Sequence, residues 1–171
     1  MDFGDNWSDQ LGKDDVAKIE AYFARKEAAR KIFGFVTFKV GGREHTVRME
    51  GRKDRGVTFE VPRGSLMTCV DYRIFDDLLI GNFMKTTLHG LDSLNAKPGE
   101  FNYSVAKYGD NGGAETEAEI EKYLAEYRRR AGIDYIISSL EDQSRNFLTR
   151  FAKQDTPLYK MMKQLYVSLV R

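Results

Sequence analysis

The spacing of apolar residues changes along the chain, and each spacing predicts a different kind of element. Residues 14–33 carry apolar side chains at helical intervals on one face, which predicts an N-terminal helix. Charged residues, among them Lys26, occupy the opposite face and are expected to be solvated. Gly34 is a suitable stop, because glycine commonly follows the last turn of a helix.

Apolar and polar positions then alternate from residue 35 to residue 62, which is the period of a β-strand. Gly41 and Gly42 suit the tight turn of a hairpin, since glycine adopts positive φ without strain. The alternation predicts an antiparallel β-meander with one buried face. Leu66 to Val70 is interpreted as its fourth strand.

A short apolar helix is predicted next, from Tyr72 to Ile80, with Gly81 as its C-terminal cap. It is inserted in the sheet, because residues 83–89 return to the character of a strand. Residues 94–115 are rich in glycine and are predicted to be mostly loop. Within this loop, three alternating apolar residues are interpreted as one more strand: Phe101, Tyr103 and Val105.

The last third of the chain has the pattern of three helices. Thr116 and Glu119 form a capping box, which satisfies the exposed N–H groups at the start of a helix. Apolar stripes recur at helical spacing up to Gly132, again over residues 133–152, and a third time after Pro157. We expect this segment to pack on the same core as the rest of the chain.

These elements predict an α+β fold with an N-terminal helix, an antiparallel β-meander containing a short inserted helix, and a C-terminal three-helix segment. A length of 171 residues suits one domain. The predicted organisation is a mobile tail at 1–12, an α+β domain at 13–93, a loop at 94–115 and a helical extension at 116–171.

Charge and cysteine content narrow the range of functions. The chain has 27 basic and 26 acidic side chains, a balance that argues against a nucleic-acid partner. Cys69 is its only cysteine, so no disulfide forms within the chain, which favours a reducing compartment. Aspartates stand near the N-terminus where a signal peptide needs basic and apolar residues, and no apolar run reaches the roughly 18 residues of a membrane span. We therefore predict a cytoplasmic protein without a transmembrane segment.

The residue pattern predicts no catalytic motif, metal site or cofactor site. His45 and His89 are the only imidazole groups, and neither stands in a nucleophile–base motif. The histidines and the cysteine lack the spacing of zinc ligands. Asp76 and Asp77 are interpreted as the polar face of the short helix, and a polar or catalytic role together with His89 is left open. An enzyme with an unfamiliar active site is a further interpretation.

Two short motifs resemble the sterol carrier protein 2-like family. Phe75-Asp-Asp-Leu78-Leu-Ile-Gly81 matches the family's short helix F-x-x-L-x-x-G, and Lys85-Thr-Thr-Leu-His-Gly90 matches the strand that follows it. The resemblance covers residues 14–93. It implies a non-enzymatic domain that holds a lipid or another hydrophobic small molecule between helices and sheet. The implied pocket is lined by Ile74, Phe75, Leu78, Leu79, Phe83 and Met84.

The alternative prediction is an accessory or structural subunit of a larger complex, which docks through its helices and N-terminal tail. Methionine adapts its shape and often lines interaction grooves, and arginines at a helix end attract acidic surfaces. An oligomer is compatible with both predictions. The candidate partner-binding residues are Trp7, Arg128, Arg129, Met161 and Met162. A packed tail, a charged helix end and core filling are the more common roles of such residues, and they stay open here.

Overall fold

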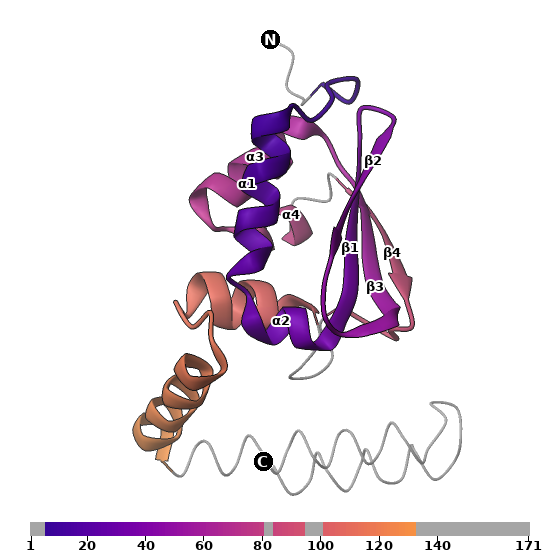
Figure 1. Cartoon of the computed structure of the whole chain (residues 1–171). Helices are drawn as coiled ribbons and strands as arrows, with labels where there is room; N and C mark the ends of the chain where they lie inside the picture. The colour runs from indigo at the N-terminus through magenta and orange to yellow at the C-terminus, as the bar shows by residue number, and fades with distance from the viewer. Residues whose placement is uncertain (1–5, 81–83, 95–100, 133–171) are drawn as a thin grey trace, which may run out of the picture. The chain divides into compact units, whose positions relative to one another are not determined.

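The computed structural model describes residues 6–80, 84–94 and 101–132. The chain divides into two compact units, residues 1–123 and residues 124–171. In the first unit, helices lie on one face of a four-stranded sheet, which confirms the α+β fold class (Figure 1). Within the described ranges, no helix is both long enough and apolar enough to cross a membrane.

The N-terminal helical segment consists of two helices, α1 (Lys13–Ala24) and α2 (Glu27–Ile32), where the sequence predicts one. The break is at Lys26, whose ψ of 73° lies outside the helical region. The Lys26 side chain turns into the protein and is 1% exposed, so its predicted place on a solvated face is wrong. Gly34, predicted to end the helix, lies in the first strand.

The sheet contains β1 (Phe33–Val40), β2 (Arg43–Arg48), β3 (Arg52–Glu60) and β4 (Lys85–His89), in the order β2-β1-β3-β4. The predicted hairpin joins β1 and β2, with Gly41 and Gly42 at φ of 57° and 75°. β1 and β3 are parallel, however, so the predicted antiparallel meander is wrong at this pair. Alternation shows which side of a strand is buried, but it carries no information on which strand lies beside it.

Two glycines let the chain pass from β2 to β3 across the start of β1. A Cβ atom on Gly34 would collide with the main chain of Arg52, and one on Gly51 would collide with the main chain of Ile32. The Gly51 N–H also donates a hydrogen bond to the Phe33 carbonyl at 3.0 Å. This close crossing puts β3 on the far side of β1 and leaves β2 as one edge of the sheet.

The segment interpreted as a fourth strand is a helix, α3 (Arg63–Tyr72), so that interpretation is wrong. A short apolar run is compatible with either element, and here the buried positions follow one face of a helix: Leu66, Met67, Cys69 and Val70. Arg73, with a left-handed φ of 56°, connects α3 to α4 (Phe75–Ile80). α4 and β4 confirm the predicted short helix followed by another strand.

Residues 101–111 are helical and include a π-helix, η1 (Tyr103–Asn111), so the strand predicted through them is wrong. Residues 117–132 form a helix that begins at the predicted capping box. The Thr116 N–H donates to Glu119 Oε2 at 3.0 Å, and the Glu119 N–H donates to Thr116 Oγ1 at 3.2 Å. The other two predicted helices lie outside the described residues.

Phenylalanine rings from the helices and the strands form the core between the two layers. Neighbouring ring centroids in this set lie 5.3–6.4 Å apart. Aromatic pairs at such distances contribute about 0.5–1.5 kcal/mol beyond the burial of their surface. The rings in this set are all fully buried, and they are Phe23, Phe38, Phe59, Phe75 and Phe101. They fix the helices against one face of the sheet.

The other face of the sheet, called the polar face here, carries rows of polar side chains that run across the strands. The register pairs Thr37 with both Thr46 and Thr58, and it pairs Thr58 with Thr87. One row is therefore threonine on all four strands. The next row alternates in charge, and it consists of Glu44, Lys39, Glu60 and Lys85.

Candidate functional site

A buried ion pair joins Lys26 and Asp110 within the helix layer. The Lys26 ammonium lies 2.5 Å from Asp110 Oδ1, and neither side chain is exposed. The Tyr22 hydroxyl donates to Asp110 Oδ2 at 2.6 Å, and the Phe75 main-chain N–H donates to the same oxygen at 3.1 Å. We call these four groups the Lys26–Asp110 cluster. It connects η1 with α1 and with the first residue of α4.

The Lys26–Asp110 cluster suits a structural role. Gly109 is needed beside it, because a Cβ atom there would lie 2.7 Å from the Lys26 ammonium nitrogen. Burial, together with the neighbouring Asp110 carboxylate, raises the pKa of Tyr22 well above its usual value, so the phenol stays a hydrogen-bond donor. Because both charged side chains are fully buried, a substrate has no access to them. Sequence reasoning missed the cluster, since Lys26 and Asp110 are 84 residues apart and no local motif connects them.

The residues implied by the family resemblance fall in different environments. Phe75 is fully buried among the core rings, and Leu78 is 3% exposed. Ile74 and Met84 are partly buried and pack against the core. The Leu79 side chain and Phe83 lie outside the described residues. That these residues bind an apolar ligand stays a prediction.

Two of these residues, Ile74 and Leu78, come together at a shallow hollow of 380 Å³ between α3 and α4. Small and polar residues complete its lining: Gly64, Ser65, Thr68, Cys69 and Asp77. Burial raises the pKa of the Cys69 thiol to about 11, so the thiol keeps its proton at neutral pH. The geometry therefore gives this hollow an apolar wall but no thiolate nucleophile.

His89 lies apart from the carboxylates near it in sequence. Its Nε2 forms a hydrogen bond with Thr58 Oγ1 at 3.0 Å on the polar face of the sheet. Asp76 is on α4, which packs on the opposite face, and it accepts a hydrogen bond from Asn111 Nδ2 at 2.8 Å. Among the described residues, no group of three or more His, Cys, Asp or Glu is arranged to hold a metal ion.

The predicted partner-binding residues also differ in what surrounds them. Trp7 is 51% exposed, as a docking side chain requires. Arg129 forms an ion pair at 2.7 Å with Glu126 on the same helix, and Arg128 is on this helix too. Met161 and Met162 lie outside the described residues. Their role in binding a partner stays a prediction.

The edge of the sheet at β2 has main-chain groups that are directed away from the protein. The Met49 N–H donates to the Gly34 carbonyl at 2.9 Å, so Met49 is a position whose main-chain groups are directed toward β1. Hydrogen-bonded and non-hydrogen-bonded positions alternate along an antiparallel pair. Alternate residues then turn their N–H and C=O groups outward, and these are Glu44, Thr46 and Arg48. Within the described part of the chain, no hydrogen bond satisfies these six groups. β2 therefore has the geometry to receive another strand.

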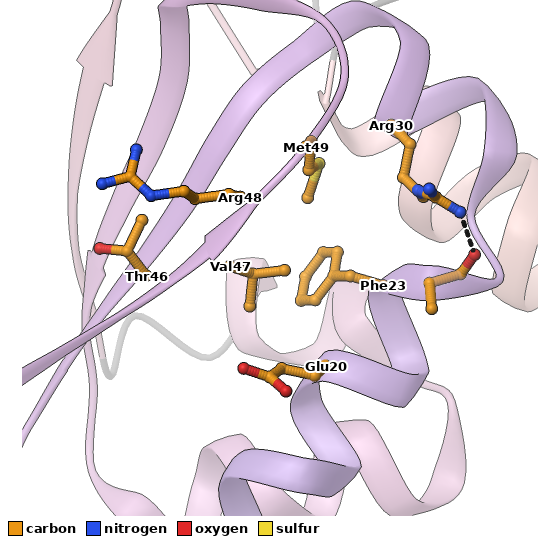
Figure 2. Close-up of a pocket in the computed structure, with 8 residues that line it drawn as sticks. Glu20, Phe23, Arg30, Thr46, Val47, Arg48 and Met49 are labelled. Atoms are coloured by element: carbon orange, nitrogen blue, oxygen red, sulfur yellow. Dashed lines mark hydrogen bonds between the residues drawn. The ribbon is translucent and has the colours of Figure 1, made fainter.

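A hollow of 480 Å³ runs along the same edge, between α1 and β2. Val47 and Phe23 point toward one another across it, while Thr46 and Arg48 point to the far side of the strand (Figure 2). Met49 adds to the apolar floor, and charged side chains stand around the rim. We call this feature the β2 groove. It combines an apolar floor with unsatisfied main-chain groups.

Several charges around the β2 groove and along the polar side of β2 are already paired. Arg30 donates to the Ala24 carbonyl at 3.0 Å and forms an ion pair with Glu50. Lys39 and Glu44 form an ion pair at 2.7 Å. Arg48 is exposed, and its guanidinium has no ion pair within the described ranges. β2 therefore presents an available positive charge on the polar face and an apolar floor on the helix side.

No family model, curated protein or solved structure matches this chain. The resemblance to the sterol carrier protein 2-like family consequently stays a prediction. Function has to be inferred from the geometry of the two hollows, the Lys26–Asp110 cluster and the sheet edge.

Proposed function

We propose that this protein is a non-enzymatic protein-interaction module that binds an extended segment along β2. The observation that carries the proposal is the set of outward main-chain groups at Glu44, Thr46 and Arg48, beside the apolar floor of the β2 groove. This keeps the accessory-subunit function predicted from the sequence, but it moves the docking surface from the helices and the N-terminal tail to a strand edge.

An extended peptide fits both parts of this edge. Its own N–H and C=O groups pair with those of β2, as in β-strand addition. Each such hydrogen bond contributes roughly 0.5–1.5 kcal/mol net, and burial of one apolar side chain contributes about 1.5–3 kcal/mol. A lipid satisfies the apolar floor but leaves the main-chain groups of β2 without partners.

The register also predicts the kind of segment that binds. A residue opposite Val47 places its side chain on the helix side, in the β2 groove, where an apolar side chain fits. Its neighbour opposite Arg48 places its side chain on the polar face, next to the available guanidinium. The preferred segment therefore has an apolar residue directly beside an acidic one.

The test is selection of extended peptides from a displayed library against the full chain, followed by calorimetric titration of wild type and two variants. Thr46→Pro removes an outward N–H that β1 does not use, and proline is tolerated on an edge strand. We expect affinity to fall at least tenfold. The matched control, Thr46→Val, keeps the N–H and loses the hydroxyl contact to Thr37 at 2.9 Å. Equal affinities of wild type and T46P would contradict the proposal.

A second candidate function is binding of an apolar small molecule in the hollow between α3 and α4. The observation that favours it is the presence of Ile74 and Leu78 in one hollow. Native mass spectrometry with fatty acyl and isoprenoid probes tests it. Thr68→Trp fills the hollow from an exposed position and should abolish binding, and a protein that ignores all probes would rule the function out.

A further inference from the structure

We infer that the segment received by β2 is β2 of a second copy of the same chain, so that two sheets join into one of eight strands. The inference rests on the proposed function, because it names the partner of the same edge. The two strands run antiparallel about a two-fold axis that passes through Thr46. Such an interface is isologous, and each feature of it occurs twice.

The charges along β2 are self-complementary in this register. With Thr46 opposite its own copy, Glu44 faces Arg48 of the second copy, and Arg48 faces Glu44 of the second copy. All four side chains lie on the polar face. Opposite charges directly across neighbouring strands stabilise pairing by about 0.2–1 kcal/mol per pair, whereas like charges oppose it. Arg48 thereby gains an acidic partner, which it lacks among the described residues of one copy.

In the same register, the outward main-chain groups of one copy face the outward main-chain groups of the other. Glu44, Thr46 and Arg48 are the residues that turn their main-chain groups outward. Opposed across the axis, they form three hydrogen-bonded pairs with two bonds each, or about six bonds in all. A shift of the register by one residue would place the outward main-chain groups of one copy opposite inward groups of the other. It would also put the side chains of facing residues on opposite faces of the sheet.

Other two-fold registers lack the charge match. An axis at His45 places Glu44 opposite Thr46, and an axis at Val47 places Arg48 opposite Thr46. Charged residues on an edge strand usually discourage pairing. On β2 their order discourages most partners but permits one arrangement with an identical strand.

The threonines of the polar face agree with an axis at Thr46. The threonine row of the polar face continues through the axis, because Thr46 meets Thr46 of the second copy. On the helix side, His45 lies opposite Val47 of the second copy, so a histidine takes the position at which a free segment would place an apolar side chain. The two β2 grooves are then on one side of the joined sheet, and their apolar floors flank the axis.

The experiment measures the mass and dissociation constant of the full chain by sedimentation equilibrium. Wild type should be a dimer of the 19.6 kDa chain. E44R and R48E each place like charges in both pairs and should weaken the dimer at least tenfold. An equimolar mixture of the two variants should form a heterodimer, because each arginine of E44R then faces a glutamate of R48E.

The double variant E44R/R48E carries both substitutions in each chain, so opposite charges face one another again across the axis. Its dimer should therefore be as stable as that of wild type, and this result would show that both substitutions permit folding. A monomeric wild type, or a dimer that neither E44R nor R48E weakens, overturns the inference. If the wild type is monomeric and selected peptides still depend on Thr46, the β2 edge binds a different segment and the proposed function stands. If those peptides also ignore T46P, both proposals fail.

Discussion

The Lys26–Asp110 cluster and the β2 edge both bring basic and acidic side chains together, but solvent reaches only the second. In the cluster, an ammonium, a hydroxyl and a main-chain N–H surround one buried carboxylate. At the edge, Lys39 and Glu44 pair in water while Arg48 and six main-chain groups keep their capacity to bind.

This difference separates charges that hold the fold from charges that can recognise a partner. A buried pair is expensive to break, because the remaining charge has lost its hydration. An exposed pair adds little stability, since water and ions screen it, but it can still select a register. The variants described next test this separation, from the largest expected effect to the smallest.

Asp110→Ala should have the largest effect on stability, because it removes the buried carboxylate closest to the Lys26 ammonium and leaves only Glu115, at 3.5 Å, as an acidic partner. We expect a loss of about 3–5 kcal/mol in the free energy of unfolding, measured by urea denaturation. Asp71→Ala is the matched control, since it removes a carboxylate that pairs with Lys18 at 2.8 Å in solvent. A similar loss in both variants would remove the distinction between the two regions.

Neutralising both partners of the buried pair should be milder than removing one. Asp110→Asn leaves the buried ammonium with only Glu115 Oε1, at 3.5 Å, as an acidic partner, whereas the double variant with Lys26→Met removes that charge and keeps an acceptor for Tyr22. We expect the double variant to be more stable than D110N by at least about 1 kcal/mol in a double-mutant cycle. Additive losses would show that Lys26 and Asp110 do not depend on one another.

The Asp15–Arg63 pair is intermediate in burial between the Lys26–Asp110 cluster and the exposed charges of the β2 edge. It should make the free energy of unfolding depend on pH. Arg63 donates two hydrogen bonds, at 2.7 and 2.8 Å, which lower the pKa of Asp15 below 3.8. A carboxyl with a lowered pKa stabilises the fold at pH above 3.8, and this contribution disappears as the pH falls through the lowered value. Asp15→Asn should therefore make the loss of stability below pH 3.8 shallower.

The check is the urea midpoint as a function of pH for wild type, D15N and a control. Asp54→Asn serves as that control, because Asp54 pairs with Arg52 but its side chain is 65% exposed. Solvent screening should make its influence on the pH profile smaller. An equal or larger change in D54N would contradict the role assigned to burial.

Arg48→Glu should have the smallest effect on folding. The side chain is exposed and unpaired in the described residues, so the free energy of unfolding should change by about 0.5 kcal/mol or less. The measurement is made at concentrations where the chain is monomeric, since association adds apparent stability. A large loss would mean that Arg48 supports the fold, and the edge charges would then resemble the buried cluster.

Local patterns in the sequence predict several elements correctly. The hairpin depends on Gly41 and Gly42 at positive φ, and the helix at 117–132 begins at its capping box. The short helix α4 and the strand after it also follow from local periodicity. These features are predictable because turns, caps and alternating faces depend on residues within a few positions of one another.

The errors have a common physical origin in contacts between distant residues. The parallel pairing of β1 and β3 depends on a crossing that Gly34 and Gly51 permit, and α3 has an apolar pattern that also suits a strand. The β2 edge was not predicted as a site, because an edge is defined by the strand that is missing beside it.

From the sequence alone come the α+β class, the buried and polar sides of the strands, and the order of charges along β2. The tertiary structure alone decides that Lys26 is buried against Asp110 and that β2 stands at an edge with its main-chain groups turned outward. The reason is that burial and strand neighbours arise from packing between segments far apart in the chain. Whether a charged residue stabilises the fold or can bind a partner therefore depends on how far the fold exposes it to solvent.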